Sequence, residues 1–191
     1  MRTGLFFGSF NPIHIGHMAI ANYMVEFTSM DELWFVVSPH NPFKKRTTLL
    51  PDHLRLEMAE LAISDDYRFR ICDIEFRMPK PSFTVDTLTY LKEKYKEKEF
   101  ILILGSDNLE HFNKWKNYEF IEQNFKRYIY PRPETDKNLF NNLVNAEIVK
   151  APLMEISSSF IRNAVKEGKN MKHFFPHKVF DFVDKMNLYK Q

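Results

Sequence analysis

The stretch GSFNPIHIGH, residues 8–17, lies between a short apolar segment and a helical pattern, and it decides the fold. Residues 3–8 before it predict a buried strand, and residues 16–27 after it predict a helix with apolar residues on one face. A strand, a turn and a helix in immediate succession are typical of a parallel sheet covered by helices.

The same alternation continues along the chain. Further strands are predicted at residues 33–38, 68–74, 100–105, 125–130 and 147–150, and further helices at about 51–62, 85–95, 157–166 and 179–186. We therefore predict an α/β fold, a Rossmann-like doubly wound parallel sheet with helices on both faces. A single domain is expected over residues 1–191, with a small helical C-terminal part at about 157–191. Ligands are expected at the carboxyl ends of the strands.

Composition restricts the classes of protein to consider. The chain has 191 residues, 44% of them hydrophobic and 27% charged, with a formal net charge of +2. This length and composition indicate one globular domain and exclude an intrinsically disordered chain. The nearly neutral charge argues against a nucleic-acid partner, so an anionic ligand must be held by local groups.

The cysteine content and the length of the apolar runs indicate the cellular compartment in which the protein is expected. Cys72 is the only cysteine of the sequence, so an intramolecular disulfide is excluded, which fits a reducing compartment. The longest apolar runs, residues 33–37 and 100–104, are too short to span a membrane, and no signal-peptide core of the usual length is present. We expect a cytoplasmic protein without a membrane partner.

The first junction between strand and helix has the residues of a phosphate site. Gly8 lets a ligand approach the backbone, and the helix N-terminus that follows presents N–H groups with a partial positive charge. His14 and His17, three residues apart, can project from the same side of the first turn and donate to phosphate oxygens. A zinc pair is the alternative for two histidines, but no neighbouring Cys, Asp or Glu completes the ligands, so no metal site is predicted.

Two motifs resemble a known superfamily. Residues 8–17 resemble the G-x-F-x-P-x-H-x-G-H signature of the HIGH-type nucleotidyltransferases. Residues 156–162, ISSSFIR, resemble the second signature of that superfamily, I-S-S-T-x-I-R. Both motifs stand in the expected order near the two ends of an α/β chain of suitable length.

Within the superfamily, the chain is similar to the bacterial nicotinate-nucleotide adenylyltransferases over nearly its whole length. The likeness rests on residues 31–36, 81–88, 105–107 and 131–133 and on Trp115. Three residues depart from the common pattern: Asn11 stands where Asp is common, Ser159 where Thr is common, and Phe43 where His is frequent.

The resemblance implies transfer of an adenylyl group from ATP to nicotinate mononucleotide, giving nicotinate adenine dinucleotide and pyrophosphate in NAD biosynthesis. The attacking phosphate is already largely ionised at neutral pH, so no general base is required. Mg²⁺ is the implied cofactor. It would enter with the ATP phosphates and needs no protein cage.

The resemblance also implies roles for individual residues. The implied catalytic residues are His14, His17, Lys44 and Arg162. The implied ATP-binding residues are Gly8, Ser9, Phe10, His14, His17, Gly105, Asp107, Ile156, Ser157, Ser158 and Arg162. The implied mononucleotide-binding residues are Ser9, Lys44, Thr84, Asp107, Trp115 and Arg132. Among these, Trp115 is expected to stack on the pyridine ring and Thr84 to open a helix whose N–H groups receive the pyridine carboxylate.

Several alternatives stay open at this point. A related adenylyltransferase could use nicotinamide mononucleotide or phosphopantetheine, and a non-catalytic nucleotide-binding domain could carry the same motifs. A fragment of a class I aminoacyl-tRNA synthetase is set aside, because the sequence has no K-M-S-K-S run. The sequence leaves open whether a homo-oligomer forms, how strongly acid is preferred over amide, which loops close on substrate, and what Asn11 and Phe43 do.

Overall fold

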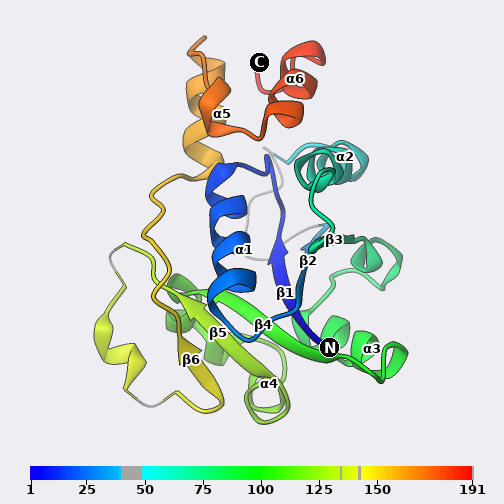
Figure 1. The fold of residues 1–191 in the computed structure, drawn as a ribbon, viewed down its shortest axis with the longest axis vertical. Coiled ribbons are helices and arrows are strands. Elements are labelled where there is room, and N and C mark those ends of the chain that lie inside the picture. Colours follow the sequence, from blue (N-terminus) through cyan, green and yellow to red (C-terminus); the bar gives the residue numbers. More distant parts are fainter. Residues whose placement is uncertain (40–48, 134, 142, 191) are drawn as a thin grey trace.

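Six parallel strands form one sheet in the order β3-β2-β1-β4-β5-β6 (Figure 1). The computed structural model describes residues 1–39, 49–133, 135–141 and 143–190. The strands are β1 (Arg2–Gly8), β2 (Glu32–Val37), β3 (Phe69–Cys72), β4 (Glu99–Gly105), β5 (Lys126–Tyr130) and β6 (Ala146–Ile148). The α-helices are α1 (Ile15–Phe27), α2 (Asp52–Ile63), α3 (Thr84–Lys94), α4 (Tyr118–Asn124), α5 (Ser158–Lys166) and α6 (His177–Lys185). The 3-10 helices are η2 (Ile74–Arg77), η3 (Ser106–Lys114), η4 (Lys137–Phe140) and η5 (Lys172–Phe174).

The central strands are apolar on both faces, because successive side chains point to opposite sides of a sheet. On β1, Leu5 belongs to one hydrophobic cluster and Phe6 to the other, and on β4 Leu102 and Ile103 divide in the same way. Helices α1, α2, α5 and α6 supply apolar residues to the Phe6 side, whereas α3 and α4 supply them to the Leu5 side. The predicted doubly wound, Rossmann-like class is confirmed.

The order of the strands places a crevice beside β1. The chain runs outward from β1 to β3 and then returns to β4, so β1 pairs with β2 on one side and with β4 on the other. The segments that leave β1 and β4 therefore depart to opposite faces of the sheet. In such a sheet, ligands bind outside the carboxyl ends of the strands where this reversal occurs. Helices α5 and α6 lie together at one end of the molecule, next to the start of α1 (Figure 1).

Some local predictions were too long or missed an element. The strand predicted at residues 68–74 ends at Cys72, because the chain turns into η2 and buries Glu75. Helix α4 was not predicted, since it is seven residues long and buries only Ile121, which gives no helical period. No helix in the described ranges is long and apolar enough to cross a membrane.

Candidate active site

A cleft of about 530 Å³ opens at the carboxyl ends of β1 and β4. Gly8 and Ser9 line it where the chain leaves β1, and Gly105 and Asp107 line it where the chain leaves β4. Its volume lies in the range of pockets that hold small ligands. The cleft therefore occupies the crevice that the strand order predicts.

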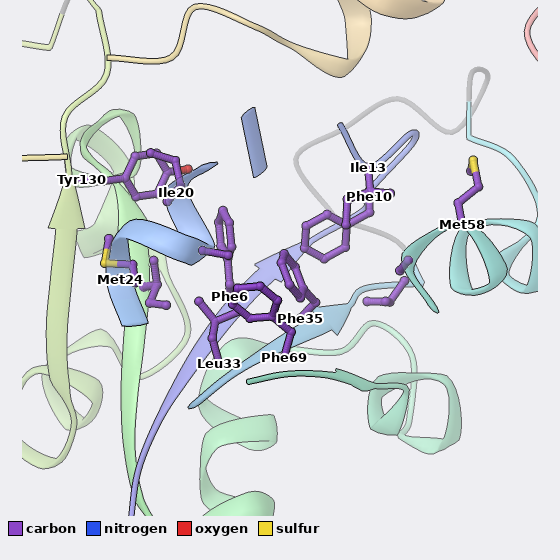
Figure 2. Packing of buried hydrophobic residues seen from close by; sticks show 14 of the residues in the cluster. Phe6, Phe10, Ile13, Ile20, Met24, Leu33, Phe35, Met58, Phe69 and Tyr130 are labelled. Carbon is purple, nitrogen blue, oxygen red and sulfur yellow. The ribbon is translucent and has the colours of Figure 1, made fainter. Parts of the chain in front are cut away.

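Phe10 gives the first signature its shape. Its backbone adopts a φ of +44°, a left-handed conformation that costs a bulky residue on the order of 1–3 kcal/mol, and its side chain is 2% exposed. The ring packs edge-on against Phe6 and Phe35, with centroids 6.0 and 5.5 Å away (Figure 2). It also packs edge-on against His17, with the centroids 5.1 Å apart. The burial of this ring holds the strained backbone in place.

The structure gives a different reason for the glycine at position 8. A Cβ at Gly8 would lie 2.8 Å from the ring of Phe10, so a side chain here would displace that ring. From the sequence, a ligand was expected to lie against the open side of Gly8. In the structure, the ring of Phe10 occupies that side. Gly8 lines the cleft with its backbone.

The two histidines of the signature lie against each other at the start of α1. Their ring centroids are 3.7 Å apart, and the backbone N–H of His14 donates to Nδ1 of His17 at 3.2 Å. Because Nδ1 of His17 accepts, the neutral imidazole carries its hydrogen on Nε2. His17 lines the cleft. His14 is buried, and burial together with the charge of Arg132 lowers its pKa to about 3, so it is uncharged at neutral pH.

The second signature contacts the first through its helix start. The side chain of Ser158 donates to the backbone carbonyl of Pro12 at 2.9 Å, and Ser158 also lines the cleft. Arg162 donates to the carbonyl of Asn11 at 2.7 Å and to the hydroxyl of Ser159 at 3.1 Å. Arg162 thus binds the loop of the first signature and is not among the residues that line the cleft. Ser157 caps α5 by accepting from the N–H of Phe160.

Sequence reasoning missed Arg55, which joins three segments beside the cleft. Its side chain is fully buried and donates to the carbonyls of Ser9, Ser38 and Pro39 at 2.6, 2.7 and 3.1 Å. It also pairs with Asp52 at 2.6 Å. Five donors in a rigid fork allow one guanidinium to satisfy several carbonyls. In the sequence, Arg55 is one polar residue of an amphipathic helix, so no pattern marks it.

Asn11 connects the first signature to distant parts of the chain. Its side-chain oxygen accepts from the N–H of Leu50 at 3.3 Å and from the hydroxyl of Tyr189 at 2.9 Å. Tyr189 follows α6 and lies 178 residues from Asn11. The residue that departs from the family pattern therefore has defined structural contacts.

The β4 side of the cleft carries Asp107 and Arg132. Nε of Arg132 lies 3.9 Å from the Asp107 carboxylate, and its guanidinium donates to the hydroxyl of Tyr130 at 3.2 Å. A Cβ at Gly105 would lie 2.3 Å from an oxygen of Asp107, so a side chain here would shift that carboxylate. Asp107 and Arg132 both line the cleft, as the resemblance implies for substrate-binding residues.

The opposite wall is formed by the start of α3 and by the segment after η3. Thr84, the first residue of α3, and Trp115 both line this wall. Lys116 joins the two segments, because Nζ lies 2.9 Å from the Asp86 carboxylate and 4.8 Å from the ring centre of Phe83. This wall combines an aromatic side chain with the N-terminus of a helix.

The predicted residues divide into three groups. Those that the cleft brings together are Gly8, Ser9, Phe10, His17, Thr84, Gly105, Asp107, Trp115, Arg132 and Ser158. Those outside its lining are His14, Ile156, Ser157 and Arg162. Lys44, predicted as catalytic, and Phe43 lie outside the described residues. Lining residues that sequence reasoning missed include Glu75, Ser82, Phe83, His111, Lys114 and Lys116.

The charges of the lining favour an anionic ligand. Lys114, Lys116 and Arg132 outnumber the carboxylates Glu75 and Asp107. In the described part of the chain, no three His, Cys, Asp or Glu side chains lie close enough together to hold a metal ion. The arrangement suits a phosphate-bearing ligand that is recognised by N–H donors and cations.

Comparison with protein families and curated relatives gives consistent matches. The chain matches the cytidylyltransferase-like family model over residues 5–164. It is 49% identical to a probable nicotinate-nucleotide adenylyltransferase of Flavobacterium johnsoniae, with 100% of both chains covered. It is 50% identical to the corresponding protein of Flavobacterium psychrophilum, also with 100% of both chains covered.

A solved structure has a similar fold. Nicotinic acid mononucleotide adenylyltransferase of Plasmodium falciparum, complexed with NaAD, superimposes with a TM-score of 0.82 at 20% identity. The match covers 99% of this chain and 97% of that one. At this level of identity, the similarity is one of fold.

Proposed function

The chain belongs to the nicotinate-nucleotide adenylyltransferases, within the cytidylyltransferase-like family, and from this we propose how its cleft carries out the reaction. The enzyme transfers the adenylyl group of ATP to nicotinate mononucleotide in NAD biosynthesis. The products are nicotinate adenine dinucleotide and pyrophosphate.

The chemistry consists of one displacement at phosphorus. A phosphate oxygen of the mononucleotide forms a bond to the α-phosphorus of ATP, and the bond from that phosphorus to the pyrophosphate oxygen breaks. The second pKa of a phosphate monoester is about 6, so the nucleophile needs no base at neutral pH. Catalysis then consists of holding two anions in line and stabilising the charge that develops on the transferred and leaving groups.

The observation that carries the residue assignments is the meeting of the two signatures at the cleft. Ser158 and Arg162 bind the Asn11–Pro12 backbone, and the same loop leads to His17 at the start of α1. We assign the ATP phosphates to this corner, with Nε2–H of His17 as a donor to the phosphates. His14, Ser157 and Arg162 shape the corner from outside the lining, and Lys44 remains a proposed catalytic residue.

The mononucleotide is assigned to the wall formed by α3 and Trp115. The first N–H groups of α3, beginning at Thr84, are suited to the pyridine carboxylate, and the Trp115 ring offers a surface for the pyridine. Asp107 is suited to accept from ribose hydroxyls, and the Arg132 guanidinium to bind a phosphate.

Adenylyl transfer from ATP generally requires a divalent metal ion, for which we propose Mg²⁺. Mg²⁺ retains several water molecules and binds largely through substrate phosphates, which fits a cleft without a cluster of ligating side chains among the described residues. We also propose that the chain works in the cytoplasm as a single nucleotidyltransferase domain. Its helical part at about 157–191 supplies the second signature.

Release of pyrophosphate tests the function directly. ATP and Mg²⁺ are supplied with nicotinate mononucleotide, nicotinamide mononucleotide or phosphopantetheine in parallel, and a His17→Ala preparation serves as the control for contaminating activity. Rapid release with the nicotinate form alone is expected. Preference for either other acceptor would overturn the pyridine assignment, and no release with any acceptor would indicate a nucleotide-binding domain.

A further inference from the structure

Glu75 is a buried carboxylate on the lining of the cleft. Its side chain belongs to η2 and the residue is 2% exposed. One carboxylate oxygen accepts from the hydroxyl of Thr87 at 2.8 Å, and the other accepts from the hydroxyl of Ser82 at 3.1 Å. In the described ranges, Glu75 forms no ion pair with a cationic side chain.

The buried carboxylate of Glu75 depends on the groups that donate to it, here the hydroxyls of Ser82 and Thr87. Its desolvation is costly unless hydrogen bonds replace the lost water, and bonds to an ionised acceptor are about twice as strong as neutral ones. Ser82 and Thr87 are themselves buried, so neither hydroxyl turns outward to water. Glu75 therefore fixes the positions of both residues.

These two residues lie on either side of the start of α3. Ser82 precedes Phe83, the N-cap of α3, and Thr87 stands one turn into the helix. The hydroxyl of Thr87 also lies 3.4 Å from the carbonyl of Phe83. Glu75 thus binds one residue that precedes the first turn of α3 and one residue within the helix. Phe83 and Thr84, which lie between the two contacts, face the cleft.

We propose that Glu75 is a positioning residue for the mononucleotide. By holding Ser82 and Thr87, it sets the distance and direction of the first N–H groups of α3 relative to Trp115, between which the pyridine carboxylate and ring bind. This inference rests on the proposed function and adds to it a determinant of acceptor binding. The two hydrogen bonds of Glu75 reach Ser82 and Thr87, on either side of the start of α3, so Glu75 acts through α3.

The location of Glu75 predicts an effect on one substrate only. The corner assigned to ATP is held by different groups, namely Arg55, Arg162 and Ser158. Loss of the Glu75 contacts should therefore weaken the mononucleotide subsite and leave the ATP subsite unchanged. A general loss of structure would affect both substrates.

The experiment measures KM for each substrate in the full-length enzyme with Glu75→Met. Methionine keeps a similar length but cannot replace the two charged hydrogen bonds, so KM for nicotinate mononucleotide should rise roughly tenfold or more. KM for ATP should stay within about twofold of the wild-type value. Glu93→Met, at an exposed position of α3 away from the cleft, is the matched control and should change neither constant.

Glu75→Gln tests the conservative replacement. A glutamine accepts with its oxygen and donates with its amide, and each hydroxyl can serve as donor or acceptor, so both contacts can form again. KM for the mononucleotide should return to within about threefold of the wild-type value. If Glu75→Met fails to fold, Thr87→Val and Ser82→Ala each remove one contact, and each should raise the same KM severalfold.

The outcomes separate this inference from the proposed function. Wild-type transfer to the mononucleotide, combined with an equal rise of both KM values or with no rise in either, would overturn the role of Glu75 alone. Absence of wild-type transfer to any acceptor would overturn the function and the inference together. A rise confined to the mononucleotide, reversed by glutamine, supports the inference.

Discussion

The backbone N–H of His14 determines which nitrogen of the neutral His17 ring carries the hydrogen. The N–H of His14 donates to Nδ1 of His17, and the rings of Phe6 and Phe10 pack edge-on around it. The hydrogen of the neutral ring therefore stays on Nε2. A donor fixed in this way needs no rearrangement when charge develops on a phosphate.

His17→Ala should lower kcat about 10²- to 10³-fold, which is the usual effect of removing one preorganised donor. The melting temperature should fall much less, because the ring lines the cleft and the neighbouring Phe10 stays buried. Pyrophosphate release and thermal unfolding, measured on the same preparation, test this. His53→Ala, at an exposed position of α2, is the control. Equal losses of activity and stability would make His17 a structural residue.

His14 makes stability depend on pH. Burial lowers its pKa to about 3 in the folded protein, against an ordinary value of 6.5. As the pH falls below about 6.5, the unfolded chain binds a proton at His14 that the folded protein does not bind until about pH 3. Stability is therefore lost across this window, by at most about 1.4 kcal/mol per pH unit.

His14→Gln should remove this contribution. Urea unfolding between pH 4 and 6 measures how the free energy of unfolding depends on pH. With decreasing pH, this free energy should fall less steeply in the variant than in the wild type. The difference in slope should correspond to at most one bound proton. His53→Gln, at an exposed position of α2, is the matched control. An unchanged slope in His14→Gln would mean that His14 is protonated in the folded state.

Among the elements, the loop between β1 and α1 depends on partners from later in the chain. Arg55 of α2, Arg162 of α5 and Tyr189 after α6 each donate to an oxygen of this loop. All three contacts involve groups that are partly or fully buried. The shape of the first signature is thus maintained by three separate segments from later in the chain.

Tyr189→Phe removes the hydroxyl that donates to the side chain of Asn11 and keeps the ring. KM for ATP should rise several-fold because the loop loses one constraint, while stability should fall by only about 1 kcal/mol. Steady-state kinetics with varied ATP, together with thermal unfolding, test this. Tyr67→Phe, at a site that is almost fully exposed, should change neither. An unchanged KM for ATP would contradict a role of Tyr189 in shaping the loop.

The sequence predicted regular elements better than their connections. The strands around Phe6, Phe35 and Ile103 were predicted to within a residue or two, because buried parallel strands are continuous apolar runs. Helix α4 and the 3-10 helices were missed, since tertiary contacts such as those of Glu75 decide them, and local periodicity does not.

For the site, local motifs were informative and distant contacts were not. The resemblance placed Asp107 and Arg132 in one site, and the structure brings them to 3.9 Å. Nothing in the sequence marks Arg55 or Tyr189, because their partners lie 46 and 178 residues away. Their effect on the cleft can be recognised only after the chain has folded.

In the molecule as a whole, the two faces of the sheet carry different parts of the candidate site. The α1 side carries both signatures and their supporting helices, and the α3 side carries the wall assigned to the mononucleotide. Cys72, at the end of β3, lies buried in the cluster on the α3 side, and burial raises the pKa of its thiol to about 11. This thiol therefore reports on the opening of that layer.

Labelling of Cys72 with a thiol reagent should be slow in the folded enzyme and should accelerate with denaturant in parallel with unfolding. The signal has one source, because the sequence contains a single cysteine. Fully denatured protein gives the upper limit of the rate. Complete labelling within minutes without denaturant would show that the α3 layer opens independently of the remaining fold.

The contacts of Asn11 also have a consequence for how the enzyme is made. Strands β1, β2 and β4, the middle of the sheet, are all present once residue 105 has been synthesised, but Asn11 then still lacks Arg162 and Tyr189. At about 5–20 residues per second, the ribosome adds the residues from 105 to 189 in roughly 4–17 s. A nascent chain can therefore have its central strands well before the loop between β1 and α1 has all of its contacts, and the bond from Tyr189 to Asn11 is among the last to form.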